Sequence, residues 1–210
     1  MQQSVRKNMP AGQFIKTVFN TFSKNLLDII TITILFTIPS FLGAGNPIIS
    51  VISMLALGFF SIAIVKVTSS FTSGSKMKWI DAIKSSFKDP IFPLSVFMIQ
   101  NFTISFGTRF FAPIGIVLSI FFVIAMQCCI FENKNTMDSI KKSFSVIKEN
   151  FLDVLLKQML LMIILNFLTM GLAMFLGKNI ISIIVLSIVL NLTTSLNLIA
   201  GNIIYGDIVK

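Results

Sequence analysis

The sequence contains no histidine, one tyrosine, one tryptophan and only eight acidic residues. Histidine is the commonest general base and metal ligand at neutral pH, so its absence excludes catalysis by a Ser-His or Cys-His pair. The two cysteines, Cys128 and Cys129, are adjacent near the end of an apolar run. Neighbouring helical positions point about 100° apart, so we interpret them as buried thiols and not as a disulfide or a metal site. We therefore expect a protein that is not an enzyme and holds no cofactor.

Charge of either sign is scarce. Only 12% of the 210 residues are charged, 55% are hydrophobic, and the mean hydropathy is +0.91. A typical soluble domain has about 25% charged residues. Here long stretches have no charge at all, and the charges are grouped between them. This pattern predicts an all-α, polytopic membrane protein in which residues 1–210 form a single integral membrane domain.

Six stretches are long enough to cross a bilayer, which takes ~20 apolar residues in a helix. They are residues 26–45, 47–67, 91–107, 110–131, 154–177 and 180–205. The third is the weakest, because Pro93, Gln100 and Asn101 leave it short and partly polar. A tilted or re-entrant segment is the alternative there. We expect six transmembrane helices arranged as three hairpins.

The 17 lysines and arginines lie almost entirely on one side of these spans. On the other side are only Arg109 and Lys178. An excess of basic residues marks the cytoplasmic face, so we predict a multi-pass plasma-membrane protein with both termini in the cytoplasm. The outer turns are then at Asn46, around Arg109 and at 178–179. Basic residues beside apolar spans are typical of a membrane face, and we expect no nucleic-acid partner.

Three cytoplasmic segments have the pattern of amphipathic helices: one before the first span, one at 75–89 and one at 135–150. Their apolar faces carry Phe14, Ile15, Val18, Phe19 and Phe22, then Trp79, Ile80, Ile83 and Phe87, then Ile140, Phe144, Ile147 and Phe151. Such helices lie in the headgroup region with the apolar face toward the hydrocarbon. Their polar faces carry the lysines that we expect to contact anionic lipid, Lys16, Lys24, Lys78, Lys84, Lys88, Lys141, Lys142 and Lys148. Anchoring of the topology and specific lipid recognition are both open interpretations.

The first and third of these segments also share residues at a constant offset of 125. Ile15, Lys16, Phe19, Asn25, Leu27 and Asp28 match Ile140, Lys141, Phe144, Asn150, Leu152 and Asp153. The middle segment, at an offset of 65, keeps Ile80 and Phe87 but has Pro90 in place of the asparagine. We interpret a threefold repeat, about 10–70, 75–132 and 135–207, of a surface helix and a hairpin. Asp28 and Asp153 are expected to accept hydrogen bonds from the first amides of their spanning helices.

The last span is the most polar. Its polar and small residues recur at intervals of three or four, as Ser187, Asn191, Thr194, Asn197 or Leu198, Gly201 and Tyr205. Two interpretations are open. Such a stripe packs helices together through hydrogen bonds and close approach, or it lines a cavity for a solute or lipid. In the second case the candidate site consists of Ser187, Asn191, Thr194, Asn197 and Tyr205. All eight carboxylates lie outside the membrane interior in this topology, so ion-coupled transport lacks its usual residues.

Residues 129–151 read Cys-Ile-Phe-Glu-Asn-Lys-Asn-Thr-Met-Asp-Ser-Ile-Lys-Lys-Ser-Phe-Ser-Val-Ile-Lys-Glu-Asn-Phe, and Tyr205 and Asp207 follow near the end. This stretch resembles bacterial integral membrane proteins that include the membrane domain fused to some glycerophosphodiester phosphodiesterases. Members show an acidic turn, an "ALKRS"-like helix, a "K-x-N-F" step into the membrane and a C-terminal Tyr-x-Asp. The corresponding residues are 139–143, 148–151, and Tyr205 with Asp207. The likeness covers the last ~80 residues, and no part is left for a phosphodiesterase barrel. The resemblance implies a stand-alone membrane module and not hydrolysis.

Three functions remain open from the sequence. The leading hypothesis is a non-enzymatic accessory or lipid-associated module of the plasma membrane, which works with protein partners or as a homo-oligomer. The second is a small-solute transport subunit, such as the six-helix substrate-binding component of a vitamin transporter, and a ligand cavity would distinguish it. The third is an immunity protein against a membrane-active peptide.

Overall fold

The computed structural model describes residues 9–42, 47–69, 77–176 and 180–209, and every regular element in these residues is an α-helix. The helices are α1 (Ala11–Lys24), α2 (Leu26–Leu42), α3 (Pro47–Val67), α5 (Trp79–Ser86), α6 (Ile91–Phe110), α7 (Ala112–Phe122), α8 (Ala125–Glu132), α9 (Thr136–Glu149), α10 (Phe151–Phe175) and α11 (Ile180–Ile208). The predicted all-α class is confirmed.

Several of these helices have the length and apolar character of membrane spans. Five qualify among the described residues: Ser50–Val67, Ile91–Phe110, Ala112–Glu132, Phe151–Phe175 and Ile181–Ile208. The helices α1 and α2 qualify only together, with a bend of 75° between them. By itself α2 has 17 residues, and the end of the first predicted span lies outside the described residues, as do the outer turns expected at Asn46 and at 178–179. The length and apolar character of these helices indicate a membrane protein.

Two predicted spans differ in detail from the structure. The third, 91–107, is one continuous helix that extends to Phe110, with Pro93 in the first turn, where a missing amide hydrogen leaves no helical bond unmade. The fourth, 110–131, is divided into α7 and α8. Gly201 of α11 packs against this break, so closely that a Cβ atom there would lie 2.7 Å from the carbonyl oxygen of Val123. The break therefore coincides with close packing against α11. The local sequence does not reveal this packing.

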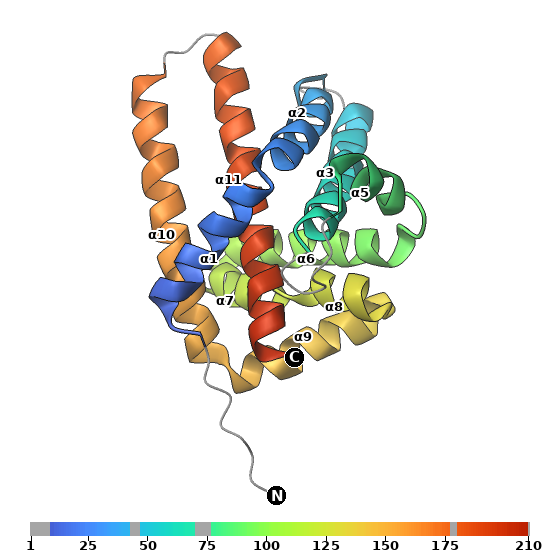
Figure 1. Cartoon of the computed structure of the whole chain (residues 1–210), viewed down its shortest axis with the longest axis vertical. Coiled ribbons are helices and arrows are strands. Elements are labelled where there is room, and N and C mark those ends of the chain that lie inside the picture. Colours follow the sequence, from blue (N-terminus) through green and yellow to red (C-terminus); the bar gives the residue numbers. More distant parts are fainter. Residues whose placement is uncertain (1–8, 43–46, 70–76, 177–179, 210) are drawn as a thin grey trace, which may run out of the picture.

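Consecutive long helices pack in pairs, α2 with α3, α6 with α7 and α10 with α11. The pairs are not parallel, since α6 lies across the direction of α10 and α11 in Figure 1. Helix α11 is central and contacts α1, α2, α3, α8 and α10. Large apolar side chains point outward from the pairs, such as Phe102, Phe167 and Phe175, which is 89% exposed. A bilayer covers such a surface, whereas water would leave it unfavourably exposed.

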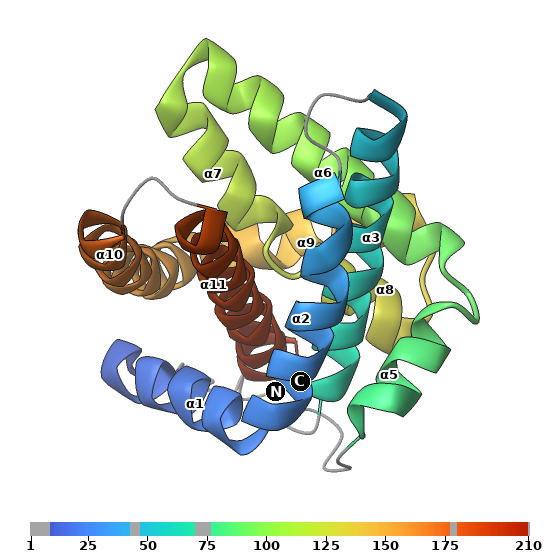
Figure 2. The ribbon, with the colours of Figure 1, turned by 90° about the horizontal axis from the view of Figure 1, so that it is seen from above.

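The three predicted amphipathic helices correspond to α1, α5 and α9, and α1 and α5 flank the α2/α3 pair (Figure 2). Asn135 caps α9, because its side chain accepts a hydrogen bond from the backbone of Asp138 at 2.9 Å. The expected immersion of their apolar faces in lipid is wrong for the main residues. Phe14, Val18 and Ile147 are at most 1% exposed and join the protein core. The neighbouring helices bury these side chains completely. A headgroup region would bury them only in part, so packing in the protein removes more apolar surface from water.

The helix bounds coincide at the offsets that suggested a repeat. Helices α1 and α9 both have 14 residues and begin 125 positions apart, and α6 begins 65 positions after α2. The connecting residues Asn25 and Asn150 have nearly the same backbone angles, φ −113° and ψ 17° against φ −119° and ψ 20°. Each side-chain amide donates to the carbonyl four residues earlier, Thr21 at 2.8 Å and Val146 at 2.9 Å. Pro90 occupies this position in the middle segment. The repeat stays a prediction, and these coincidences support it.

Candidate functional site

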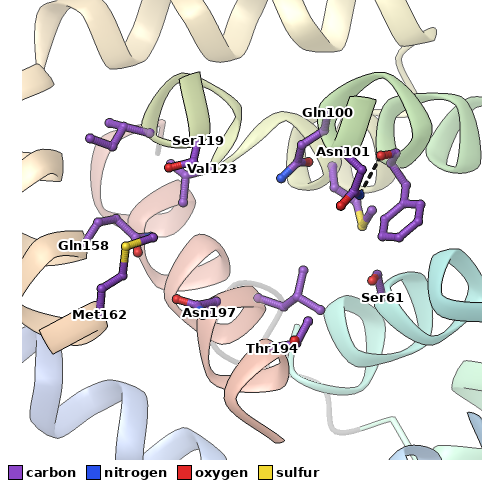
Figure 3. A pocket seen from close by; sticks show the side chains of 13 residues that line it. Ser61, Gln100, Asn101, Ser119, Val123, Gln158, Met162, Thr194 and Asn197 are labelled. Carbon is purple, nitrogen blue, oxygen red and sulfur yellow. Dashed lines mark hydrogen bonds between the residues drawn. The ribbon is translucent and has the colours of Figure 1, made fainter. Parts of the chain in front are cut away.

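A pocket of about 200 Å³ lies where α3, α6, α7, α8, α10 and α11 meet (Figure 3). Its polar lining residues are Ser61, Gln100, Asn101, Ser119, Gln158, Thr194 and Asn197. The apolar remainder consists of Phe97, Ile120, Val123, Met126, Met162 and Leu198. None of the 13 lining residues is charged. The pocket is therefore polar but carries no formal charge.

Helical spacing brings these side chains together. Thr194, Asn197 and Leu198 follow one another at intervals of three and one, so they share a face of α11. Gln100 and Asn101 lie near the middle of α6 and face the same space. The polar residues that made the third predicted span weak are therefore compatible with a membrane, because they line the pocket. Polar side chains inside a span face the protein interior and not the lipid.

Most polar groups of the pocket already use one hydrogen within their own helix. The hydroxyls of Ser61, Ser119 and Thr194 donate to main-chain carbonyls at 2.9, 2.7 and 3.0 Å. The side-chain amides of Asn101 and Asn197 donate in the same way at 2.8 and 3.2 Å. Gln100 and Gln158, in contrast, have no hydrogen-bond partner within the part of the chain that the structure describes, and Gln158 is only 4% exposed.

The polar stripe of the last span does not act as one unit. Of the predicted candidates, Thr194 and Asn197 line the pocket, and Ser187, Asn191 and Tyr205 do not. Ser187 donates to a carbonyl of its own helix, and Asn191 donates to Thr37 of α2 at 2.7 Å. Tyr205 donates to Glu132 in a partly buried polar cluster. Helix packing and cavity lining therefore occur on the same helix at different heights.

Besides Gln100 and Asn101, three polar lining residues, Ser61, Ser119 and Gln158, were not among the predicted site residues. Ser61 and Ser119 are single polar residues in apolar runs and Gln158 follows Lys157, and neither pattern carries a signal of what the side chain faces. Only the packing of α3, α7 and α10 around the pocket brings them together.

Glu132 is the centre of a polar cluster at the end of α8. It accepts hydrogen bonds from Tyr205 at 2.8 Å and from Lys142 at 2.5 Å, and it forms an ion pair with Lys134 at 3.0 Å. The hydrogen bond with Glu132 raises the pKa of Lys134 above its ordinary value. The ring of Tyr205 also contacts Phe131, with centroids 5.3 Å apart. The cluster connects α11 to α8 and α9.

A second cluster surrounds Lys157, whose side chain is almost fully buried. Its Nζ lies 2.7 Å from Asp153 and 2.8 Å from Asp207. Asp207 also accepts a hydrogen bond from the backbone of Met9 at 3.2 Å, just before α1. From the sequence, Lys157 was expected only to be one of the cytoplasmic basic residues, although its position four residues after Asp153 was a signal for an ion pair.

The two aspartates of the proposed repeat have partners other than the predicted ones. Asp28 accepts a hydrogen bond from the backbone amide of Trp79 at 3.2 Å, so it caps α5 and not its own helix. Asp153 pairs with Lys157. Each aspartate thus connects its spanning helix to another segment of the chain or stabilises a buried cation.

The lysines predicted to contact lipid are mostly at the surface. The exposed ones are Lys16, Lys24, Lys78, Lys84, Lys88, Lys141 and Lys148, and only Lys142 is partly buried, against Glu132. A hollow of about 380 Å³ lies beside α5 and α8, and its lining includes Lys66, Lys88, Lys134 and Asp89. Lys66 donates to the carbonyl of Ser85 at 2.7 Å. The hollow therefore has more positive than negative side chains.

No protein-family model, curated protein or solved structure matches this chain. The resemblance to the membrane domain of the phosphodiesterases stays an expectation from its motifs. Within the described residues, no group of three or more histidine, cysteine, aspartate or glutamate side chains is placed to hold a metal ion.

Proposed function

We propose that this chain is a non-enzymatic plasma-membrane protein that crosses the bilayer six times as three hairpins, with both termini in the cytoplasm, and binds anionic lipid at its cytoplasmic surface. In this function it is an accessory module that works with protein partners or as a homo-oligomer. The exposed lysines on or directly beside α1, α5 and α9 are the observation that carries the proposal.

Contacts between distant segments support the proposed topology. If the chain crosses six times, then the start of α10 and the ends of α8 and α11 are all on the cytoplasmic side. The pairs Lys157 with Asp207 and Glu132 with Tyr205 join these ends at 2.8 Å each. A topology with an odd number of spans between them would separate the members of each pair by about 30 Å of hydrocarbon.

The lysine positions support lipid binding. Because the apolar faces of α1 and α9 are buried in the core, these helices present their exposed lysines outward. A lysine near an anionic membrane surface contributes about 1 kcal/mol of binding free energy. The hollow lined by Lys66, Lys88 and Lys134 is a place where one lipid phosphate can meet several lysines.

The test is the lipid that remains bound after purification. The seven exposed lysines are replaced by glutamine in one variant and by arginine in a second, and phospholipids copurified in mild detergent are quantified by mass spectrometry. We expect the wild type and the arginine variant to be enriched in anionic lipid over the source membrane, and the glutamine variant to lose this enrichment. Equal enrichment in all three proteins would refute lipid binding through these lysines.

The pocket favours a second candidate function, a small-solute transport subunit. Thr194 and Asn197 of the last helix line it together with side chains from four other spanning helices. A deletion strain with a specific uptake defect and an unchanged phospholipid composition would support transport over the accessory role. The opposite pair of results would support the accessory role.

A further inference from the structure

The hydroxyl groups of the pocket can only accept hydrogen bonds from a ligand. A hydroxyl has one hydrogen, and those of Ser61, Ser119 and Thr194 are used in bonds to main-chain carbonyls of their own helices. While these bonds are kept, the three oxygen atoms have only lone pairs available for a ligand. Three helices thus each supply an acceptor to the same space.

The two asparagines of the pocket add acceptors in the same way. The group that faces a carbonyl must be the amide nitrogen, so the bonds of Asn101 and Asn197 to their own helices fix which atom remains. Oδ1 therefore accepts in both, and one N–H of each amide nitrogen also remains. Oδ1 of Asn197 is buried and has no partner within the described residues. A buried acceptor without a partner is unfavourable, so a donor that reaches this oxygen would stabilise the site.

The amides of Gln100 and Gln158 are the remaining polar groups, and within the described residues neither has a partner. Gln158 is 96% buried, since its exposed fraction is 4%. Figure 3 shows the two glutamines on opposite sides of the pocket, one from α6 and one from α10. They supply both donors and acceptors at its two walls.

We propose that this pocket binds a small hydrogen-bond-donating group, rich in hydroxyls or bearing an amine, that is neutral or carries one positive charge. Seven side-chain oxygens can accept and four amide nitrogens can donate, and no lysine or arginine lines the pocket to attract an anion. The volume of about 200 Å³ is below the ~300 to 1,000 Å³ of sites for drug-sized ligands. The group is therefore a small free solute or the headgroup of a lipid.

Binding in the pocket is independent of the lysine-dependent lipid binding, because the two sites share no charged residue. The pocket chemistry gives a ligand class to the second candidate function and does not require transport. Binding without uptake would still support this ligand class. Loss of the lysine-dependent lipid would not affect binding in the pocket.

The experiment has one arm for each source of the group. In the first, ethanolamine, glycerol and, as an acceptor-only anion, acetate are titrated into the protein in an amine-oxide detergent, and the melting temperature is measured. In the second, the protein is placed in nanodiscs of equal phosphatidylethanolamine and phosphatidylcholine, and retained lipid is identified by native mass spectrometry. The trimethylammonium of phosphatidylcholine has no N–H donor, so it is the matched control headgroup.

We expect stabilisation by ethanolamine or glycerol but not by acetate if the group is a free solute, and preferential retention of phosphatidylethanolamine if it is a headgroup. Gln158→Leu and Asn197→Leu should each weaken the effect about tenfold. Asn166→Leu, at an exposed position of α10, should leave it unchanged. Ser61→Ala removes one acceptor with little change of volume and replaces the leucine variants if they do not fold. No response to either donor together with equal retention of the two lipids would overturn the proposal, as would an effect that all pocket variants keep.

Discussion

Tyr205 donates a hydrogen bond to Glu132 at 2.8 Å, although the two residues are 73 positions apart. Glu132 is the residue that Lys134 and Lys142 also contact, so one carboxylate connects α11 to the α8–α9 segment. A hydrogen bond to a charged group in a partly buried position is stronger than an average one. Removal of such a connection between distant segments should therefore have a measurable cost in stability.

Tyr205→Phe should lower the free energy of unfolding by about 1.5 kcal/mol, because the carboxylate of Glu132 loses a donor while the ring keeps its contact with Phe131. Denaturation in detergent micelles, followed by circular dichroism, measures the change. In a Glu132→Gln background the same substitution should cost less, since the hydrogen bond is then to a neutral group. An equal cost in both backgrounds would show that the hydrogen bond does not stabilise the fold.

Lys157→Met should be far more destabilising, by about 3 to 5 kcal/mol, because it leaves Asp153 and Asp207 without their shared cation in a mostly buried place. Lys148→Met, at an exposed position of α9, is the matched control and should change stability by less than about 0.5 kcal/mol. Melting temperatures of the two variants in the same detergent make the comparison. Similar losses in both would contradict a structural role for the buried ion pairs.

Gly201→Ala should destabilise the protein by about 1 to 3 kcal/mol, because a Cβ atom would come within 2.7 Å of the Val123 carbonyl oxygen. Gly171→Ala offers a control in another long helix, since a Cβ atom there has no neighbour within 4 Å. That substitution should be neutral or stabilise by up to about 1 kcal/mol, because alanine favours helix over glycine. Thermal unfolding distinguishes the two, and equal effects would argue against the close packing of α11 on the break.

At the helix junctions, replacement of proline by asparagine should be tolerated, and replacement of asparagine by proline should not. Asn25→Pro removes a backbone amide that donates to Phe22 and forces φ away from −113°, so it should destabilise by about 2 to 3 kcal/mol. Pro90→Asn requires no such change, because φ of −81° suits both residues, and it should alter stability by less than about 1 kcal/mol. Expression level and melting temperature measure both. A large loss with Pro90→Asn would weaken the case for equivalent junctions.

The proposed orientation is tested by labelling single cysteines in intact cells with a membrane-impermeant maleimide. Cys128 and Cys129 are buried and are first replaced by alanine. Asn46→Cys and Lys178→Cys should react, because both positions are at predicted outer turns, and Lys141→Cys on α9 should react only after the cells are opened. The reverse pattern would invert the membrane orientation and remove the cytoplasmic assignment of the lysines.

Much of the fold was predictable from local patterns. Hydropathy determined where the long helices lie, and the 3.6-residue period of Phe14, Val18 and Ile147 with their neighbouring lysines predicted α1 and α9. Both signals are local, because a span must be apolar along its whole length and a surface helix must be apolar on one side. The scarcity of charge and the absence of histidine are properties of the composition alone, and they limit the chemistry that the side chains can perform.

Tertiary structure alone decided what the polar residues do. Thr194 and Tyr205 belong to the same periodic stripe, yet one lines a pocket and the other contacts Glu132. The burial of Lys157, the break at Val123 and the inward apolar faces of the surface helices depend on segments far away in the chain. Period and hydropathy indicate which side of a helix avoids lipid or water. Which partner occupies that side is determined by how the helices pack, and this packing is set by contacts between distant residues.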